Sequence, residues 1–189
     1  MLKKHKIVII DGYNVLRTSD RYAKLAGQAP NFKDWTDEIW NAAREALLND
    51  VLQIIEKTDQ AFIIYDAAKR ISRDDANSLE SKIKNVEIIF TEKDETADAR
   101  IQKLSHTFRE KGMEVQIVSS DLGIQDATMH AGVTRTSSRE FSNNAQENIQ
   151  ESKMQTISSN SQHPEMRSKI EDIVDNEVAE QLRQLRDSL

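Results

Sequence analysis

The sequence predicts an α/β domain built from parallel βαβ units. Three short runs rich in β-branched residues, at positions 7–10, 61–65 and 115–118, are typical of strands buried on both faces of a sheet. Stretches with a helical apolar period separate these runs. Strands that alternate with helices of this length favour a parallel sheet with right-handed crossovers.

The remaining elements follow from local patterns. A short helix and a loop are expected between the first strand and Lys33. A covering helix follows, with apolar residues at helical spacing from Trp35 to Ile54, and Trp35 and Trp40 are expected to pack in the core or at its rim. The later expected elements are a strand at 86–90, a helix that opens within 91–98 and stops near Gly112, a strand at 114–118, a connection at 121–132 and an edge strand at 133–136.

The composition changes near residue 142, and this change sets the expected domain organisation. Residues 1–142 are expected to form the α/β domain. Residues 143–163 are rich in Asn, Gln, Ser and Glu and predict a polar helix that fades into a linker. Residues 164–189 begin with a proline and keep a helical apolar period, so they predict an amphipathic helix that packs on its own domain or on a partner.

The bulk composition excludes several classes of protein. The 189 residues carry a net charge of −6, which argues against general electrostatic coating of nucleic acid, although a local basic groove remains open. No cysteine is present, so disulfides, zinc–thiolate sites and thiol nucleophiles are excluded. No apolar stretch approaches the roughly 20 residues that span a bilayer. We therefore expect a cytoplasmic protein without membrane insertion.

Aspartates follow the ends of the three strand-like runs. Asp11 and Asp66 come directly after buried runs, and Asp121 follows the third run through two serines. Carboxyl ends of parallel strands meet at one edge of the sheet, where ligands bind. With Asp98 and the carboxamide of Asn14, these side chains predict an oxygen-rich site for Mg²⁺ or Mn²⁺, which suits in-line phosphoryl displacement. For each single aspartate, a helix cap or a turn is the alternative interpretation.

Basic residues come shortly after the same strands. Arg17, Arg21 and Lys24 follow the first strand. A second group follows the strand at 61–65, and a third follows a later turn. Any one cluster is more often a solvated surface than a binding site, and clusters in equivalent positions narrow the difference between that interpretation and a nucleic-acid-binding rim. The candidates on this rim are Arg17, Arg21, Lys69, Arg70, Arg135 and Arg139, with the hydroxyls of Ser119 and Ser120.

Other chemistries lack their motifs. The four histidines do not pair at metal-ligand spacing, and no strained Gly-x-Ser-x-Gly elbow is present. Neither Gly-x-Gly-x-x-Gly nor a Gly-Lys-Ser/Thr loop occurs, so a nucleotide cofactor is not expected.

Five segments in this order resemble the YacP-like NYN family of PIN-like metal-dependent nucleases, which includes a ribosome-associated endonuclease acting on messenger RNA. The resemblance covers Lys6 to about Phe141 and, weakly, the tail at 177–186. The segments are Asp-Gly-Tyr-Asn-Val-Leu at 11–16, Tyr-Asp-Ala at 65–67, Glu-Thr-Ala-Asp at 95–98, Ser-Ser-Asp at 119–121 and Arg-Thr-Ser-Ser-Arg-Glu at 135–140.

This resemblance implies a three-layer αβα PIN-like, Rossmann-like fold with a small parallel sheet of four to five strands and a C-terminal helical tail. It also implies a Mg²⁺ or Mn²⁺ site and endonucleolytic hydrolysis of RNA. It implies that residues 1–142 form the nuclease domain and that Arg135 and Arg139 hold the RNA backbone. The sequence departs from the family pattern at 122–130. Carried over by position, the implied metal ligands are Asp11, Asp98, Asp121 and Glu95, and the implied catalytic residues are Asp11, Asn14, Asp66, Asp98 and Asp121.

The favoured function is therefore a metal-dependent endoribonuclease acting on mRNA, with the ribosome as an expected partner. The alternative is a non-catalytic RNA- or ribosome-binding factor that keeps the same fold. A phosphohydrolase of the haloacid-dehalogenase type is disfavoured, because Tyr13 stands where that chemistry needs a second aspartate.

Overall fold

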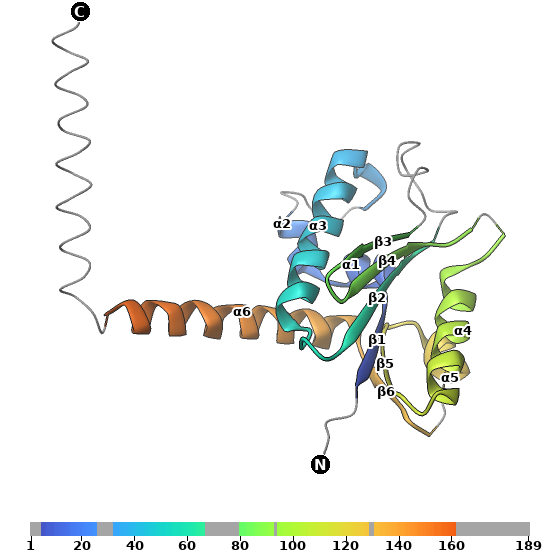
Figure 1. The fold of residues 1–189 in the computed structure, drawn as a ribbon. Helices are drawn as coiled ribbons and strands as arrows, with labels where there is room; N and C mark the ends of the chain where they lie inside the picture. Colours follow the sequence, from blue (N-terminus) through green and yellow to red (C-terminus); the bar gives the residue numbers. More distant parts are fainter. Residues whose placement is uncertain (1–4, 26–31, 67–79, 93, 129–130, 162–189) are drawn as a thin grey trace, which may run out of the picture. The chain divides into compact units, whose positions relative to one another are not determined.

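The computed structural model describes residues 5–25, 32–66, 80–92, 94–128 and 131–161 (Figure 1). Lys69, Arg70 and the predicted helix at 164–189 lie outside these residues. The chain divides into two compact units, residues 1–148 and 149–189, and each is described by itself. The expected domain boundaries at 142 and 163 stay predictions.

A mostly parallel sheet forms the centre of the first unit, as the sequence predicts. Its strand order is β3-β4-β2-β1-β5-β6, and β1 pairs in parallel with both β2 and β5. In this register Ile10 lies between Ile63 and Val118, so the carboxyl ends of the three central strands lie side by side. The strands are β1 Lys6–Asp11, β2 Gln60–Tyr65, β3 Glu80–Ile83, β4 Val86–Phe90, β5 Glu114–Val118 and β6 Val133–Thr136.

The expected count of four to five strands is wrong, because β3 adds a sixth. This strand pairs antiparallel with β4 through a tight connection in which Lys84 has a positive φ of 57°. Its sequence, Glu-Ser-Lys-Ile, contains one large apolar residue, and that residue, Ile83, is exposed. An edge strand of this kind gains its order from backbone pairing, so it lacks the apolar pattern that reveals buried strands.

Helices cover both faces of the sheet and make the predicted three layers. In Figure 1, α1, α2 and α3 lie on one side of the strands, and α4 and α5 lie on the other. The covering helix α3 begins after Thr36, and α4 begins after Thr96, whose hydroxyl caps it by accepting from the Ala99 N–H. The helices of the first unit are α1 Gly12–Thr18, α2 Asp20–Leu25, the 3-10 turn η1 Phe32–Asp34, α3 Asp37–Ile54, α4 Ala97–Glu110 and α5 Leu122–Ala127.

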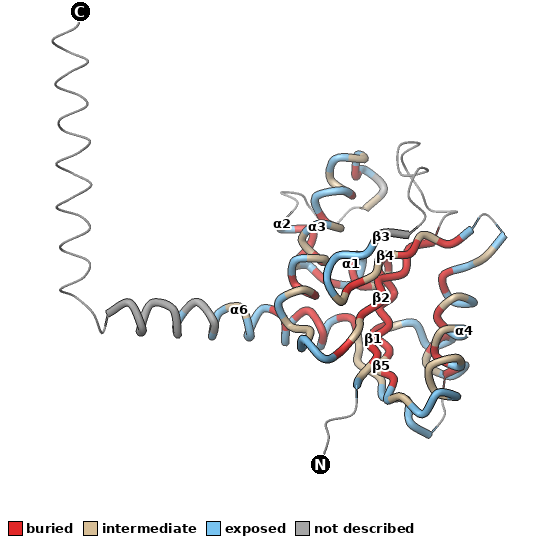
Figure 2. Tube along the Cα trace, in the orientation of Figure 1, coloured by how far each residue is buried: buried red, intermediate tan, exposed pale blue. Residues whose placement is uncertain are grey.

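Each face of the sheet has its own core, and the central strands are buried along nearly their whole length (Figure 2). The face under α1–α3 is aromatic and includes Tyr13, Tyr65, Trp35 and Trp40. The two tryptophans are 6% and 2% exposed, which confirms that they pack in the core. The face under α4 is mainly aliphatic and includes the fully buried Ile101, with Phe62 as its buried aromatic residue.

The last described helix, α6 Ser138–Ser161, begins four residues before the predicted change at 142. Its first turns belong to the first unit, where Phe141 and Ala145 are buried. From Ile149 onward the same helix belongs to the second unit. None of the described helices is long and apolar enough to cross a membrane.

Candidate functional site

Asp11 lies at the carboxyl end of the central strand β1 and is 8% exposed. It is both the last residue of β1 and the N-cap of α1, because its Oδ1 accepts from the Asn14 N–H at 3.1 Å. This cap satisfies one of the free donors at the start of α1. The strand therefore ends in a turn that holds a nearly buried carboxylate at the sheet edge.

Gly12 lets this turn lie directly against the core. A Cβ at Gly12 would stand 2.2 Å from Cε1 of the Tyr65 ring, which is closer than any real carbon contact. The Tyr13 ring packs edge-on to Tyr65, with 5.0 Å between centroids, and also edge-on to Trp40. The Asp-Gly-Tyr-Asn motif is thus fixed by packing on one side and by hydrogen bonds on the other.

Asn14 connects three strand ends that are distant in the sequence. Its Oδ1 accepts from the Ser120 N–H at 2.9 Å and from the Ser138 hydroxyl at 2.7 Å. The Ser138 N–H in turn donates to the Ser120 Oγ at 3.0 Å. These bonds join the segments that follow β1, β5 and β6, so we name Asn14, Ser120 and Ser138 the serine–asparagine node.

Ser119 lies between two of the predicted acids. Its hydroxyl donates to Asp11 Oδ2 at 3.4 Å and accepts from the Asp121 N–H at 3.1 Å. Asp121 is exposed and caps α5, because its Oδ1 accepts from the Gly123 N–H at 2.7 Å. The Ser119 hydroxyl, on a residue that is 1% exposed, therefore joins the Asp11 carboxylate to the backbone of Asp121.

The remaining predicted acids come directly after β2 or in the segment that follows β4 in the chain. Asp66 follows β2, the neighbour of β1, and is 8% exposed. Glu95 precedes α4 and forms a salt bridge of 3.8 Å with Arg100, and Asp98 is exposed in the first turn of α4. In the part of the chain that the structure describes, no three Asp, Glu or His side chains gather in a way that could hold a metal ion. The set Asp11, Asp98, Asp121 and Glu95 therefore stays a prediction.

The acidic residues at this edge fit a hard cation that is bound through one or two carboxylates and keeps several of its waters. Mg²⁺ is bound in this way, so it does not require a full protein cage. Asp11 ends β1 and Asp121 follows β5, the neighbouring strand, so each brings a carboxylate to the edge where parallel sheets bind ligands. This donor set contains only oxygen, which suits Mg²⁺ or Mn²⁺ rather than a soft metal.

The predicted RNA-binding cations occupy different environments. Arg17 is exposed and lies over the rings of Tyr13 and Trp40, 5.6 and 5.8 Å from their centroids. Arg135 is half-buried on β6, and Arg139 is exposed in the first turn of α6.

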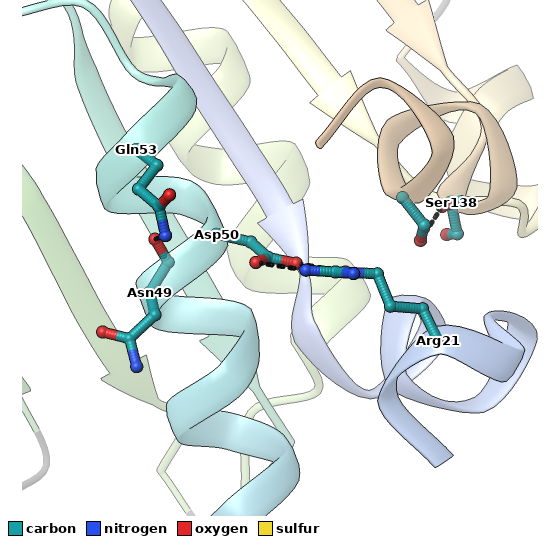
Figure 3. A network of polar contacts seen from close by, with 6 residues as sticks. Arg21, Asn49, Asp50, Gln53 and Ser138 are labelled. Carbon is teal, nitrogen blue, oxygen red and sulfur yellow. Dashed lines mark hydrogen bonds and ion pairs between the residues drawn. The ribbon is translucent and has the colours of Figure 1, made fainter. Parts of the chain in front are cut away.

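Arg21 is held by a buried acid. Its Nε and Nη2 donate to the two carboxylate oxygens of Asp50 at 2.7 and 2.8 Å. Asp50 belongs to α3 and is 3% exposed. Figure 3 shows Arg21 extending from α2 toward Asp50, with Ser138 labelled at the start of α6. Hydrogen bonding to Asp50 raises the pKa of Arg21, so this guanidinium is a fixed charge.

Sequence reasoning missed two residues of this region. Ser138 is fully buried and completes the serine–asparagine node, and Asp50 orients Arg21. The position of Ser138 could have identified it, because it follows the short strand β6 in the same way that Ser120 follows β5. The position of Asp50 could not, since an acid within a long amphipathic helix is typical of a solvated residue.

Comparisons with known proteins agree on one family. The YacP-like NYN domain matches residues 8–187 of the chain. The uncharacterized protein YacP of Bacillus subtilis strain 168 is 30% identical over 138 residues, which is 71% of this chain and 72% of that protein.

Solved structures show the same fold. The crystal structure of Rae1 (YacP) from Bacillus subtilis matches with a TM-score of 0.62 and 24% identity, covering 95% of this chain and 94% of that one. The structure of a single-residue variant of the same protein matches with a TM-score of 0.58 and 25% identity, covering 82% and 84%. With the matched domain spanning nearly the whole sequence, the chain belongs to the YacP-like NYN domain family.

Proposed function

We propose that this protein is a divalent-metal-dependent endoribonuclease that cleaves messenger RNA, in the cytoplasm and in contact with the ribosome. The observation that supports it most is the placement of Asp11. A nearly buried carboxylate stands at the carboxyl end of the central strand and is held by the Asn14 N–H and the Ser119 hydroxyl. Membership of the YacP-like NYN family, with its resemblance to PIN-like nucleases, supports the reaction class.

In this proposal Asp11 and Asp121 hold Mg²⁺ or Mn²⁺, with Asp98 and Glu95 as further ligands and Asp66 as a second buried carboxylate at the edge. The ion, when bound, would polarise the scissile phosphate and lower the pKa of an attacking water. Asp11 is held in one orientation before substrate arrives, because both of its oxygens accept hydrogen bonds. Ser119 is a positioning residue, since its buried hydroxyl joins the Asp11 carboxylate to the backbone N–H of Asp121.

The serine–asparagine node keeps the three strand ends in register. Asn14 accepts from Ser120 and Ser138, so a change in any of the three residues would shift the turn that carries Asp11. Arginines on the rim would hold the RNA backbone, and Arg17 and Arg139 are exposed for this task.

The test uses the purified full chain with a single-stranded mRNA fragment labelled at its 5′ end. We expect internal cleavage with Mg²⁺ or Mn²⁺, none after chelation with EDTA, and a loss of at least about 100-fold in kcat/KM for Asp11→Asn. Asn caps helices as well as Asp does, so Asp11→Asn should remain folded.

The matched control is Asp126→Asn, an exposed acid on α5, which should cleave like the wild type. Binding of the RNA without cleavage under every metal condition would overturn the proposal and favour a non-catalytic RNA-binding factor. Programmed ribosomes offered as substrate then test the ribosomal context: faster cleavage of translated RNA than of free RNA is expected.

A further inference from the structure

An open cavity of about 570 Å³ lies beside the serine–asparagine node, between α1, α2 and the first turns of α6. All three elements belong to the first unit. The side chains that line it come from eight residues: Thr18, Ser19, Asp20, Arg21, Lys24, Arg139, Asn143 and Gln146.

The lining is cationic and rich in hydrogen-bond donors. It contains three basic side chains, Arg21, Lys24 and Arg139, against one acid, Asp20. No ion pair engages Lys24 or Arg139 within the described residues. Asn143 and Gln146 add neutral amide donors. Such a lining fits an anion that carries several acceptor oxygens.

Arg21 contributes a guanidinium whose position is already fixed. The pair with Asp50 uses its Nε and Nη2, so Nη1 is not needed for that contact. Asp50 is buried and is not among the residues that line the cavity. A charge that is pre-oriented in this way loses little side-chain entropy when it binds an anion.

The cavity begins next to the candidate catalytic edge. Arg139 follows Ser138, whose hydroxyl donates to Asn14 at 2.7 Å. Thr18 and Ser19 stand at the far end of α1, the helix that Asp11 caps. Seven helical residues span about 10 Å, so the cavity extends roughly that far from Asp11 along α1.

The lining contains no aromatic side chain. This distinguishes it from a second cavity of about 320 Å³ under α3, where Tyr65 and Phe90 lie with Arg44. Recognition of single-stranded nucleic acid bases relies on stacking against aromatic rings, whereas a cationic groove follows the backbone. The chemistry of the first cavity therefore matches phosphate and ribose rather than a base.

We propose that this cavity binds the sugar–phosphate backbone of the substrate RNA next to the scissile bond, with Lys24 and Arg139 as phosphate contacts and without selecting bases. The inference rests on the proposed function, since it identifies where the RNA leaves the acidic edge. Lys24 and the amides of Asn143 and Gln146 thereby gain a role in substrate binding.

The test measures RNA binding separately from cleavage. Two fluorescein-labelled 12-nucleotide RNAs, one of adenosines and one of uridines, are titrated without divalent metal and at several salt concentrations. For the double variant Lys24→Gln, Arg139→Gln we expect at least tenfold weaker binding to both RNAs. The slope of log K against log salt should become shallower by about 1.4, the value for two lost phosphate contacts on a single strand.

The matched control removes two cations from α4: Lys103→Gln, Arg109→Gln. Both residues line a different cavity, and this variant carries the same change in net charge. It should bind RNA within about twofold of the wild type. A third variant, Asp20→Asn, removes the acid of the cavity and should tighten binding severalfold, a change that misfolding does not produce.

Equal losses for the α2–α6 variant and the α4 control would overturn the inference, because general charge would then explain the binding. A loss confined to one of the two RNAs would also overturn it, since the cavity would then read bases. Neither result depends on catalysis. Failure of the proposed function shows instead as intact, cavity-dependent RNA binding without cleavage in the presence of Mg²⁺ or Mn²⁺.

Discussion

The carboxyl edge of the sheet has two halves that differ in how their polar residues are held. At the β1–β5–β6 half, Asp11, Asn14, Ser119 and Ser138 take part in hydrogen bonds that join segments more than 100 residues apart. In the segments that follow β2 and β4, which we call the β2–β4 half, Asp66 is buried directly after β2, Glu95 precedes α4, and Asp98 lies in the first turn of α4. The polar residues of the β1–β5–β6 half form a connected hydrogen-bond network, whereas the acids of the β2–β4 half come from a loop and a helix.

The hydrogen bonds of the β1–β5–β6 half indicate that this half of the edge is organised before any ligand binds. Side chains fixed by packing and hydrogen bonds can present charge to a developing transition state without reorganising. The β1–β5–β6 half meets this condition through the Asp11 cap and the serine–asparagine node. We therefore expect it to set the geometry of the reaction and the β2–β4 half to complete the binding of the ion.

Replacing Asp98 by Asn gives the largest effect that separates the halves. We expect kcat/KM to fall by about 10- to 100-fold and the metal concentration for half-maximal cleavage to rise, because the proposed function makes Asp98 a charged ligand and the hydrogen-bonded network does not include it. Cleavage assays across a Mg²⁺ titration measure both quantities. The thermal midpoint should stay within about 1 °C of the wild type, since Asp98 is exposed.

Wild-type activity of Asp98→Asn would contradict the division of labour, because the β1–β5–β6 half would then suffice for the ion. Glu147→Gln, an exposed acid on α6, is the control for a lost surface charge.

Adding a methyl group at Gly12 tests the packing beneath the network. Gly12→Ala places a carbon 2.2 Å from the Tyr65 ring, which is buried and in contact with Tyr13. We expect a loss of about 2 kcal/mol in the free energy of unfolding, since rigid backbone and a buried ring must separate. Urea denaturation measures it, with Gly123→Ala as a milder comparison, because a Cβ there meets only Asp121 Oδ1 at 3.1 Å. Equal stability of Gly12→Ala and the wild type would show that the turn does not press on Tyr65.

Removing the Ser138 hydroxyl tests the node itself. Ser138, which is fully buried, donates one of the two hydrogen bonds to Asn14 Oδ1, so Ser138→Ala leaves that oxygen with one donor. We expect a loss of about 1 kcal/mol in stability and about a tenfold fall in kcat, with KM unchanged, because the turn that carries Asp11 loses a fixed neighbour.

Ser137→Ala is the matched control for this variant. The Ser137 hydroxyl accepts from the Glu140 N–H and supports the start of α6. Its loss should cost similar stability but leave kcat unchanged. If both variants lower kcat equally, the effect belongs to the helix start and not to the node.

The central strands could be predicted from the sequence, but the contacts between the ends of these strands could not. The β-branched runs of β1, β2 and β5 need only their local pattern, because burial on both faces demands apolar residues throughout. Asp11 was recognisable for the same reason, as a polar residue directly after such a run. Ser138 and Asp50 were not, since a hydroxyl or carboxylate acquires its partner from the topology, and their partners lie 124 and 29 residues away. The edge strand β3 was not predicted because backbone pairing with β4 holds it, and this pairing leaves no pattern in the side chains.

The smallest expected effect concerns Tyr65, the residue at the boundary between the halves. Its ring lies under Gly12, while the next residue, Asp66, opens the β2–β4 half. Burial raises the pKa of the Tyr65 hydroxyl above its ordinary value near 10. The protonated form is therefore favoured in the folded state, so its contribution to stability is complete below about pH 10 and is lost as the pH rises above that value.

Urea denaturation between pH 8 and 11 should show the free energy of unfolding falling only above about pH 10, and Tyr65→Phe should make that fall shallower. An unchanged slope in Tyr65→Phe would mean that the hydroxyl is solvated, and the ring would then not seal the boundary between the two halves.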